Sequence, residues 1–270
     1  AVCPRGGRHA MVGATRYAAE YDGILAGAPG FNLPKAAAAS ILGGQLYNSV
    51  ATTPGNLGTG FTQAERNTVA SAILTRRDAL DGASDGIVQN VAACRVAFKL
   101  QRDVPSCTGA RDGTCLTDAQ KNVIGKIFSG PTTSNGRKIY SSFPFDAGIG
   151  GSGIPFWEFT APLALDSGAV GIIFKVPPES PAGFNGPAFT LGANLDTLVQ
   201  QINATNALYT ESAMRFMTPP DPTDMSRLQR RGGKIIVYHG VSDPIFSVDD
   251  TEAWYKGLLL ESRGSAINFA

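Results

Sequence analysis

The densest group of oxygen ligands in this 270-residue chain is the stretch Asp78-Ala-Leu-Asp-Gly-Ala-Ser-Asp-Gly-Ile87. Its carboxylates fall at Asp78, Asp81 and Asp85, and a glycine follows each of the last two. Calcium prefers six to eight oxygens, several of them charged, from a backbone that turns tightly around it. The spacing is not that of an EF-hand, whose twelfth position is a Glu where this chain has Gln89. The pattern therefore indicates either a calcium loop or a surface loop of Asp-Gly turns.

A second candidate for chemistry is Asp243, which closely follows a run of β-branched residues. Lys234-Ile-Ile-Val-Tyr-His239 predicts a buried strand, and Gly240-Val-Ser-Asp-Pro244 predicts the turn after it. Catalytic groups gather at the carboxyl ends of strands in open α/β sheets. The alternative is a turn residue ahead of a proline.

The elements that must position these residues follow from periodicity. An apolar face predicts a helix from about residue 10 to 21, and residues 24–29 predict a short buried strand. Residues 32–60 indicate a transition out of this core. Helices are expected near 224–230 and at 247–260, and a strand is expected to start at Ala266. Capping boxes predict helix starts at two further places. The boxes are Thr62 with Glu65, for a helix over about 63–76, and Thr117 with Gln120.

Residues 141–193 are rich in Gly, Pro, Phe and Trp and show little periodicity, so we expect a loop-rich, aromatic stretch. Its aromatic side chains either line a pocket for a phenolic ring or pack the interior of this region. They are Phe156, Trp157, Phe159 and Phe174.

Three segments together resemble the tannase and feruloyl esterase family: Tyr21-Asp-Gly-Ile-Leu-Ala-Gly-Ala-Pro29, the Asp-rich loop, and residues 234–244. The resemblance covers nearly the whole chain. It implies an α/β fold with a partial α/β-hydrolase core, formed by residues 1–50 and 224–270, and a large inserted lid over residues 51–223. It also implies hydrolysis of phenolic carboxylic esters such as feruloyl or galloyl esters, by attack of a serine assisted by a histidine and an aspartate.

The resemblance also assigns roles to residues. It implies calcium ligation by the carboxylates of Asp78, Asp81 and Asp85 and by the carbonyls of Ala83 and Ile87. Asp243 matches the acid of the catalytic triad. Pro4 stands at the nucleophile position after Cys3, and Arg5 stands where a backbone N–H helps to form the oxyanion hole.

The chain departs from the family pattern at the nucleophile. Pro4 has no hydroxyl, and its φ near −65° conflicts with the strained turn of a nucleophile elbow. The histidines, His9 and His239, do not match the family's general base, which lies in a His-Cys step beyond the next strand. The chain opens Ala1-Val2-Cys3 and ends before such a step, so we expect a fragment or a processed chain.

One pair of cysteines lies close together in the sequence. Cys107 and Cys115 flank a short loop that can close into a bridge, and the resemblance pairs the same two positions. Cys94 has lost its family partner because Arg77 stands there, and Cys3 has lost the Cys of the His-Cys step. We expect both to remain thiols unless they pair with each other.

Composition limits the other functions. A net charge of +1 with no long basic run favours neither nucleic acid nor a membrane surface, and no apolar run reaches the length of a membrane span. An Asn-Ala-Thr triplet at Asn203 fits secretion. Two alternatives to the esterase remain: a non-catalytic, calcium-stabilised module that binds an aromatic ligand, and a Cys3–His9 nucleophile pair. The composition leaves the oligomeric state open.

Overall fold

The computed structural model describes residues 4–270, which form a mainly helical fold around a small parallel sheet. The helices and strands are α1 (Pro4–Arg16), β1 (Gly23–Gly27), α2 (Leu33–Ser49), α3 (Gln63–Arg77), α4 (Val91–Ala97), α5 (Leu100–Asp103), α6 (Asp118–Ser129), α7 (Gly186–Gly192), α8 (Leu195–Ile202), α9 (Ala213–Met217), α10 (Ser226–Arg230), β2 (Lys234–Tyr238) and α11 (Val248–Glu261). The 3₁₀ turns are Leu57–Gly60, Asp78–Asp81, Ala147–Gly150 and Ser265–Asn268. π-helical turns cover Pro155–Thr160, Pro162–Asp166 and Ala169–Phe174.

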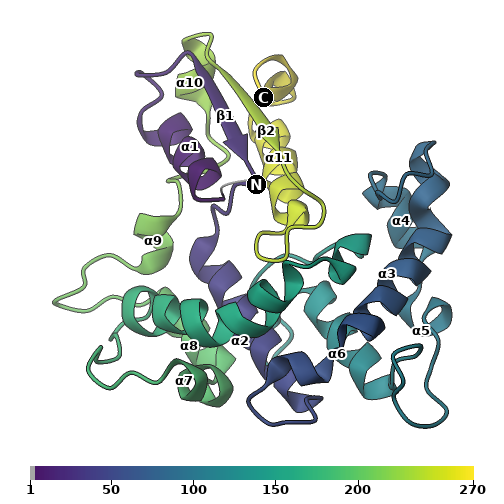
Figure 1. Ribbon diagram of the computed structural model, residues 1–270. Coiled ribbons are helices and arrows are strands. Elements are labelled where there is room, and N and C mark those ends of the chain that lie inside the picture. The colour runs from purple at the N-terminus through teal and green to yellow at the C-terminus, as the bar shows by residue number, and fades with distance from the viewer. Residues whose placement is uncertain (1–3) are drawn as a thin grey trace.

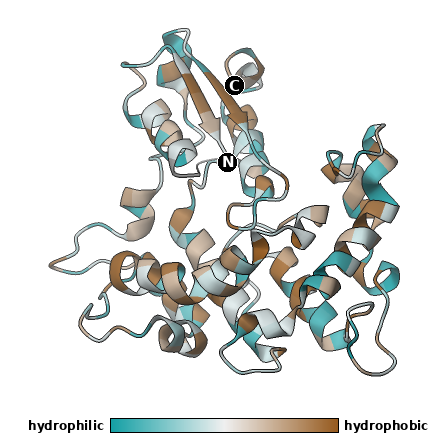
Figure 2. Cartoon of the chain, viewed as in Figure 1, coloured by the Kyte–Doolittle hydropathy of each residue, from teal (hydrophilic) through white to brown (hydrophobic). Residues whose placement is uncertain are grey.

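Strands β1 and β2 pair in parallel, with Leu25 opposite Ile236. Their alternate residues Ala26 and Ile235 are buried against side chains of α1, α10 and α11, which surround the strands in Figure 1. Leu25 and Ile236 point the other way and are 63% and 65% exposed. Both strands are mostly brown, that is hydrophobic, in Figure 2. The described residues bury only one face of this sheet, although parallel sheets are normally covered on both faces.

Helices α2 to α8 form a second layer below the sheet (Figure 1). One hydrophobic cluster joins the end of α2 to α3, α4 and α6, and another joins the start of α2 to α8 and the π-helical segment. Helix α2 is therefore the element shared by both clusters. The division into residues 1–50 with 224–270 and residues 51–223 stays a prediction.

Most local predictions from the sequence are confirmed. Both capping boxes are present, at Thr62 with Glu65 and at Thr117 with Gln120, and they begin α3 and α6. The strands predicted over 24–29 and 234–239 appear as β1 and β2, although they are only partly buried, and the helix after the turn appears as α11 with Ser247 as its N-cap.

The interpretation of residues 32–60 as a transition is wrong, because α2 occupies 33–49. Alanines favour the helix, and Pro34 stands in its first turn, where a missing N–H costs nothing. Gly44 lets the helix approach its neighbour closely: a Cβ there would lie 3.0 Å from Cβ of Pro162. The small residues that suggested a linker instead permit close helix packing.

The expectation of a loop-rich stretch over 141–193 is wrong for its centre. Residues 154–174 are helical, largely with π-type turns. Such turns shift the positions that face inward, so buried residues do not recur every 3.6 positions. Pro155 and Pro162 add to the irregular pattern. Periodicity therefore could not reveal this helix.

Two predicted boundaries are also wrong. The first helix spans 4–16 rather than 10–21. Residues 265–268 form a 3₁₀ turn and not a strand. In a 3₁₀ turn residues three apart lie on one side, which buries Ala266 and Phe269 together. The carbonyl of Phe269 still accepts from N–H of Ile235, at 2.7 Å.

Within residues 4–270, every helix is too short or too polar to cross a lipid bilayer.

Candidate functional site

Asp243 lies in the turn that connects β2 to α11, as the sequence predicts. Its Oδ1 accepts from the backbone N–H groups of Ile245 and Phe246, both at 2.9 Å. No donor in residues 4–270 lies within hydrogen-bond distance of Oδ2. The histidine nitrogen near it, Nε2 of His239, is 3.7 Å away. The side chain is 13% exposed. One oxygen is thus fixed by the turn, and the other is available to a partner.

His239 is a satisfied structural side chain. Its Nε2 lies 2.8 Å from the carbonyl of Phe246, and its Nδ1 lies 2.7 Å from the hydroxyl of Thr251. A carbonyl only accepts, so Nε2 carries the proton and Nδ1 accepts from the hydroxyl. Both ring nitrogens are occupied within the fold, and the ring is not placed to act as a general base.

A buried carboxylate links this turn to the second layer. Asp146 is 7% exposed, and its Oδ1 accepts from the hydroxyl of Ser242 and, at 2.6 Å, from N–H of Gly148. Burial raises the pKa of Asp146, against the lowering effects of these bonds and of Arg77. A Cβ at Gly148 would lie 2.4 Å from Cβ of Ser242, so only glycine fits at this contact. The residue before Asp243 is therefore held by the loop of residues 146–150.

Two hollows meet at this turn. The first, here called the junction cavity, has walls from α2, α6, residues 143–158 and the turn of residues 241–244. It comprises about 460 Å³ of empty space including open solvent, of which about 40 Å³ can hold the centre of a water molecule. The second is a groove of about 1100 Å³ including open solvent, between the turn, Ala28 and residues 86–89. Asp243 lines both hollows, and the end of the Asp-rich loop forms a wall of the groove.

Sequence reasoning missed two polar residues of the junction cavity, Glu158 and Tyr47. Burial raises the pKa of Glu158 to about 7; the nearby hydroxyl of Tyr47 lowers this pKa, and the charge of Asp166 raises it. Burial and then Glu158 raise the pKa of Tyr47. In residues 4–270 no Lys, Arg or His lies within ion-pair distance of Glu158. The signal for Glu158 available in the sequence was a Glu beside Phe and Trp in a Gly- and Pro-rich stretch.

The aromatic residues predicted for a phenolic pocket do not line the junction cavity. Phe159 and Phe174 are buried in separate hydrophobic clusters, which supports the interior-packing alternative for these two. Phe156 and Trp157 are 47% and 40% exposed and contact each other edge to face. The apolar walls of the cavity come instead from Ile127, Phe128, Phe143, Ile149 and Ile154.

The predicted nucleophile and oxyanion positions lie in the first turn of α1, which begins at Pro4. Backbone N–H groups in a first turn have no partner within the helix, so that of Arg5 fits a donor role. Gly7 lets α1 touch β1: a Cβ there would lie 2.1 Å from the carbonyl oxygen of Gly27. Cys3 lies outside the described residues, so the Cys3–His9 alternative stays a prediction; His9 itself is exposed and contacts Arg8.

The Asp-rich loop is closed by its own carboxylates. Asp78 Oδ1 accepts from N–H of Asp85 and Gly86, at 3.2 and 2.8 Å. Asp81 accepts from Gln89 and Ala83, and these bonds lower the pKa of Asp81. Asp85 accepts from Ile87, at 3.0 Å. The donor set of hard oxygens fits calcium, although no three His, Cys, Asp or Glu side chains of residues 4–270 converge as metal ligands.

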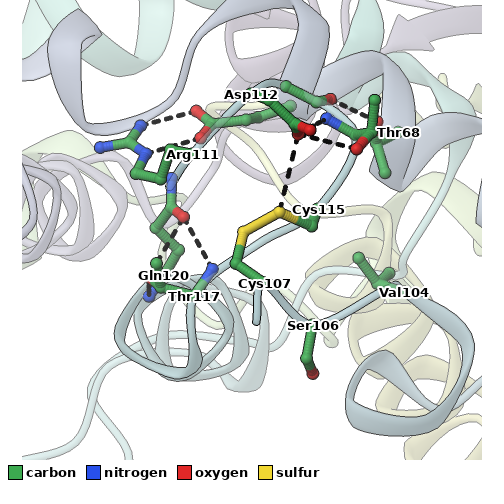
Figure 3. Close-up of a disulfide and its surroundings, with 12 residues drawn as sticks. Thr68, Val104, Ser106, Cys107, Arg111, Asp112, Cys115, Thr117 and Gln120 are labelled. Carbon is green, nitrogen blue, oxygen red and sulfur yellow. Dashed lines mark hydrogen bonds and ion pairs between the residues drawn. A yellow bond between two sulfur atoms is a disulfide. The ribbon is translucent and has the colours of Figure 1, made fainter. Parts of the chain in front are cut away.

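The Cys107–Cys115 disulfide predicted from the sequence is present, and Figure 3 shows its surroundings. Arg111, within the closed loop, makes two bonds to the buried carboxylate of Glu65, at 2.6 and 2.7 Å. The pKa of Glu65 falls because these and other hydrogen bonds outweigh burial, which raises it. The bridge therefore holds a loop that anchors the capping box of α3.

Cys94 is a buried thiol, as predicted, and burial raises its pKa to about 11 despite the nearby charge of Arg77. The guanidinium of Arg77 lies over the ring of Phe98, 4.7 Å from its centroid, and its Nη1 donates to the carbonyl of Phe145. Its Nε has no hydrogen-bond partner among residues 4–270. A buried cation thus occupies the position where the family carries a second cysteine.

Comparisons with known proteins agree with this arrangement of strands, turn and lid. The family model for tannase and feruloyl esterase matches residues 2–261. The crystal structure of feruloyl esterase B from Aspergillus oryzae superposes with a TM-score of 0.68 at 22% identity, over 97% of this chain and 47% of that one. Tannin acyl hydrolase from Aspergillus niger gives 0.59 at 18% identity, over 96% and 46%. The fold is that of an α/β-hydrolase with a large helical lid. The chain belongs to the tannase and feruloyl esterase family.

Two curated relatives illustrate the range of the family. Mono(2-hydroxyethyl) terephthalate hydrolase from Piscinibacter sakaiensis is 32% identical over 296 residues, which cover 98% of this chain and 48% of the relative. Probable feruloyl esterase B-1 from Neosartorya fischeri is 25% identical over 264 residues, which cover 94% and 43%. The chain thus spans about half the length of the relatives it matches.

Proposed function

We propose that the protein acts on carboxylic esters of aromatic acids, of the feruloyl or galloyl kind, by acyl transfer, with Asp243 as the acid of a Ser-His-Asp mechanism. The observation that carries this proposal is the position of Asp243, on a strand-end turn and in the wall of the junction cavity. Its anchored Oδ1 and available Oδ2 suit an acid that orients a histidine.

The roles of the remaining groups follow from the mechanism. A serine attacks the ester carbonyl, the histidine takes and returns its proton, and backbone N–H groups stabilise the oxyanion. In this chain Arg5 stands at the oxyanion position and Pro4 at the nucleophile position, where no hydroxyl is available. His239 is fully hydrogen-bonded and His9 is exposed on α1. The chain therefore contributes the acid and the lid.

These departures favour a second candidate, a module that binds aromatic esters without turning them over. It shares the ligand class with the first candidate and differs from it in catalysis alone. Binding and hydrolysis therefore have to be measured separately.

Binding of the ligand class is tested by titrating methyl ferulate into the chain in a calorimeter, with ethyl butyrate as the aliphatic comparison. We expect saturable binding of the aromatic ester alone. Val241→Trp, which fills the space at both hollows, should abolish it, whereas Leu208→Trp, at a residue 78% exposed and outside both, should not. Equal binding of both esters, or binding unchanged by Val241→Trp, would contradict the proposal.

We further propose that the Asp-rich loop binds one calcium ion through the carboxylates of Asp78, Asp81 and Asp85 and the carbonyls of Ala83 and Ile87. Support comes from the donor chemistry and from the two glycines at positive φ, Gly82 and Gly86, which let the loop turn tightly. To bind the ion, the three carboxylates must release the backbone N–H groups that now donate to them, so this loop rearranges on binding.

We also propose that the protein is secreted. The Cys107–Cys115 disulfide fits an oxidising compartment, and Asn203, in an Asn-Ala-Thr triplet, is exposed at the end of α8. The binding partner that the site supports is a small molecule, the aromatic ester.

A further inference from the structure

Glu158 and Tyr47 line the junction cavity, among apolar side chains and the polar residues Asp146, Ser242 and Asp243. Tyr47 comes from α2 and Glu158 from the π-helical segment, and both line the same hollow as Asp243. The ring of Tyr47 is fixed edge-on against Phe61 and Phe159, with centroids 5.6 and 5.0 Å apart. The position of its hydroxyl is therefore set by the interior of the lid.

The electrostatics of the cavity have one sign. Glu158, Asp146 and Asp243 line it, and no Lys, Arg or His among the described residues does. The guanidinium of Arg66 lies 5.5 Å from the centroid of the Phe159 ring, and its terminal nitrogens donate to the carbonyl of Phe61 and to Gln63. Asp146 accepts from Ser242 and Gly148, whereas Glu158, near the hydroxyl of Tyr47, accepts no hydrogen bond within residues 4–270. Glu158 is thus the acceptor left for a ligand.

These features select among aromatic acids. A ring hydroxyl donates a hydrogen bond to a carboxylate, and such bonds to charged groups are the strong ones. A ring carboxylate would instead meet three acids without a cation, which penalises it. A ring methoxy group fills similar space but leaves the acceptor without its donor, and sites built for a hydroxyl reject such analogues strongly.

We propose that Glu158 and Tyr47 are specificity-determining residues that recognise the ring hydroxyl of a phenolic ester in the junction cavity and exclude esters whose ring carries a carboxylate. This assignment rests on the proposed function, because it takes an aromatic ester as the ligand. It adds the ring substituent and the two residues that read it.

The experiment compares three esters by calorimetry at about pH 8, where a carboxyl of pKa about 7 is largely ionised. They are methyl 4-hydroxycinnamate, methyl 4-methoxycinnamate and monomethyl terephthalate. The wild-type chain should bind the hydroxy ester about tenfold more tightly than the methoxy ester, the effect of one hydrogen bond to a charged group. The anionic ester should bind more weakly than both.

Variants assign the preference to residues. Glu158→Gln keeps the shape and removes the charge, so binding of monomethyl terephthalate should strengthen about tenfold. The double variant Glu158→Leu, Tyr47→Phe should bind the hydroxy and methoxy esters equally. Asp166→Asn is the matched control: this buried acid on the same helical segment bonds to Ser40 and lines neither the junction cavity nor the groove, so all preferences should persist. Thermal melts confirm that each variant is folded.

The outcomes separate this inference from the proposed function. If none of the three esters binds, the ligand class and the assignment both fail. If the hydroxy and methoxy esters bind the wild type equally, or if the preference survives in the double variant, the ligand class stands and the assignment to Glu158 and Tyr47 is overturned.

Discussion

At the scale of single residues, two carboxylates of one cavity have different environments and therefore suit different tasks. Asp243 receives two backbone N–H bonds that hold it in a turn. Glu158 accepts no hydrogen bond within residues 4–270 and lies near the hydroxyl of Tyr47 and the charge of Asp166. A carboxylate held by backbone donors suits the orientation of a histidine, whereas one in an apolar wall suits recognition of a donor on a ligand.

The raised pKa of Glu158 makes stability depend on pH. Because burial raises its pKa from 4.5 to about 7, the folded state keeps a proton between these values that the unfolded state has released. Stability should therefore fall as pH rises from about 5 to 7.5, by roughly 1–3 kcal/mol from this group. Asp166, with its pKa raised to about 6 by burial, acts in the same direction. Tyr47 and Arg66 do not titrate in this range.

Urea unfolding at the two pH values checks this prediction. Glu158→Gln should show a smaller loss of unfolding free energy than the wild type between pH 5 and 7.5. The remaining loss reports Asp166 and other buried acids such as Asp250. Identical losses in variant and wild type would show that Glu158 does not titrate in this window.

The Cys107–Cys115 bridge should stabilise the chain by roughly 2–3 kcal/mol in the chain-entropy model, because it closes a short loop. Replacing both cysteines with serine should lower the unfolding free energy by that amount. A reductant should destabilise the wild type to the level of the double variant and leave the variant itself unchanged. A variant that responds to the reductant would point to another bridge.

At the scale of elements, the sequence predicted best where side chains near in sequence determine the structure. The capping boxes of α3 and α6 each depend on two residues three positions apart, and both were predicted correctly. The helix at 33–49 was missed because its small residues suggested a linker, whereas Gly44 is explained by the approach of Pro162, a contact between distant segments. The π-helical segment was missed because its turns break the helical period.

The same contrast, between signals adjacent in sequence and contacts between distant segments, applies to the site. The turn of Asp243 follows from a strand signal and a turn signal that are adjacent in sequence. Glu158 and Tyr47 are more than a hundred residues apart, and only tertiary packing places them in one cavity. Sequence reasoning without a structure could not pair them.

The Asp-rich loop gives a prediction for one element. If it binds calcium, adding EDTA should lower the melting temperature, since a ligand at 100 times its Kd stabilises by about 2.7 kcal/mol. Asp78→Asn with Asp81→Asn and Asp85→Asn should melt at the same temperature with and without EDTA. Asp112→Asn, which alters a similar Asp-Gly turn outside the loop, should respond like the wild type. An unchanged melting temperature of the wild type in EDTA would remove the calcium proposal.

At the scale of the whole molecule, the lid is present together with the turn that carries Asp243, the proposed triad acid, while the proposed nucleophile position carries Pro4. Removing one member of a catalytic triad costs several orders of magnitude in rate, and losses within a triad do not add. Pro4 supplies no hydroxyl, and neither His9 nor His239 is placed as a base. We therefore expect this chain to bind aromatic esters and to leave them intact.

The decisive measurement is hydrolysis of methyl ferulate and methyl gallate by the purified 270-residue chain. We expect no turnover above the rate in buffer, and we expect none from Pro4→Ser either, because a serine without a base is a poor nucleophile. A protein of this family that carries both the serine and the downstream histidine should hydrolyse both esters under the same conditions. Asp243→Asn is the informative variant of this chain. Turnover by the wild type that disappears in Asp243→Asn would mean that Asp243 already serves a working nucleophile, and the interpretation of Pro4 would be wrong.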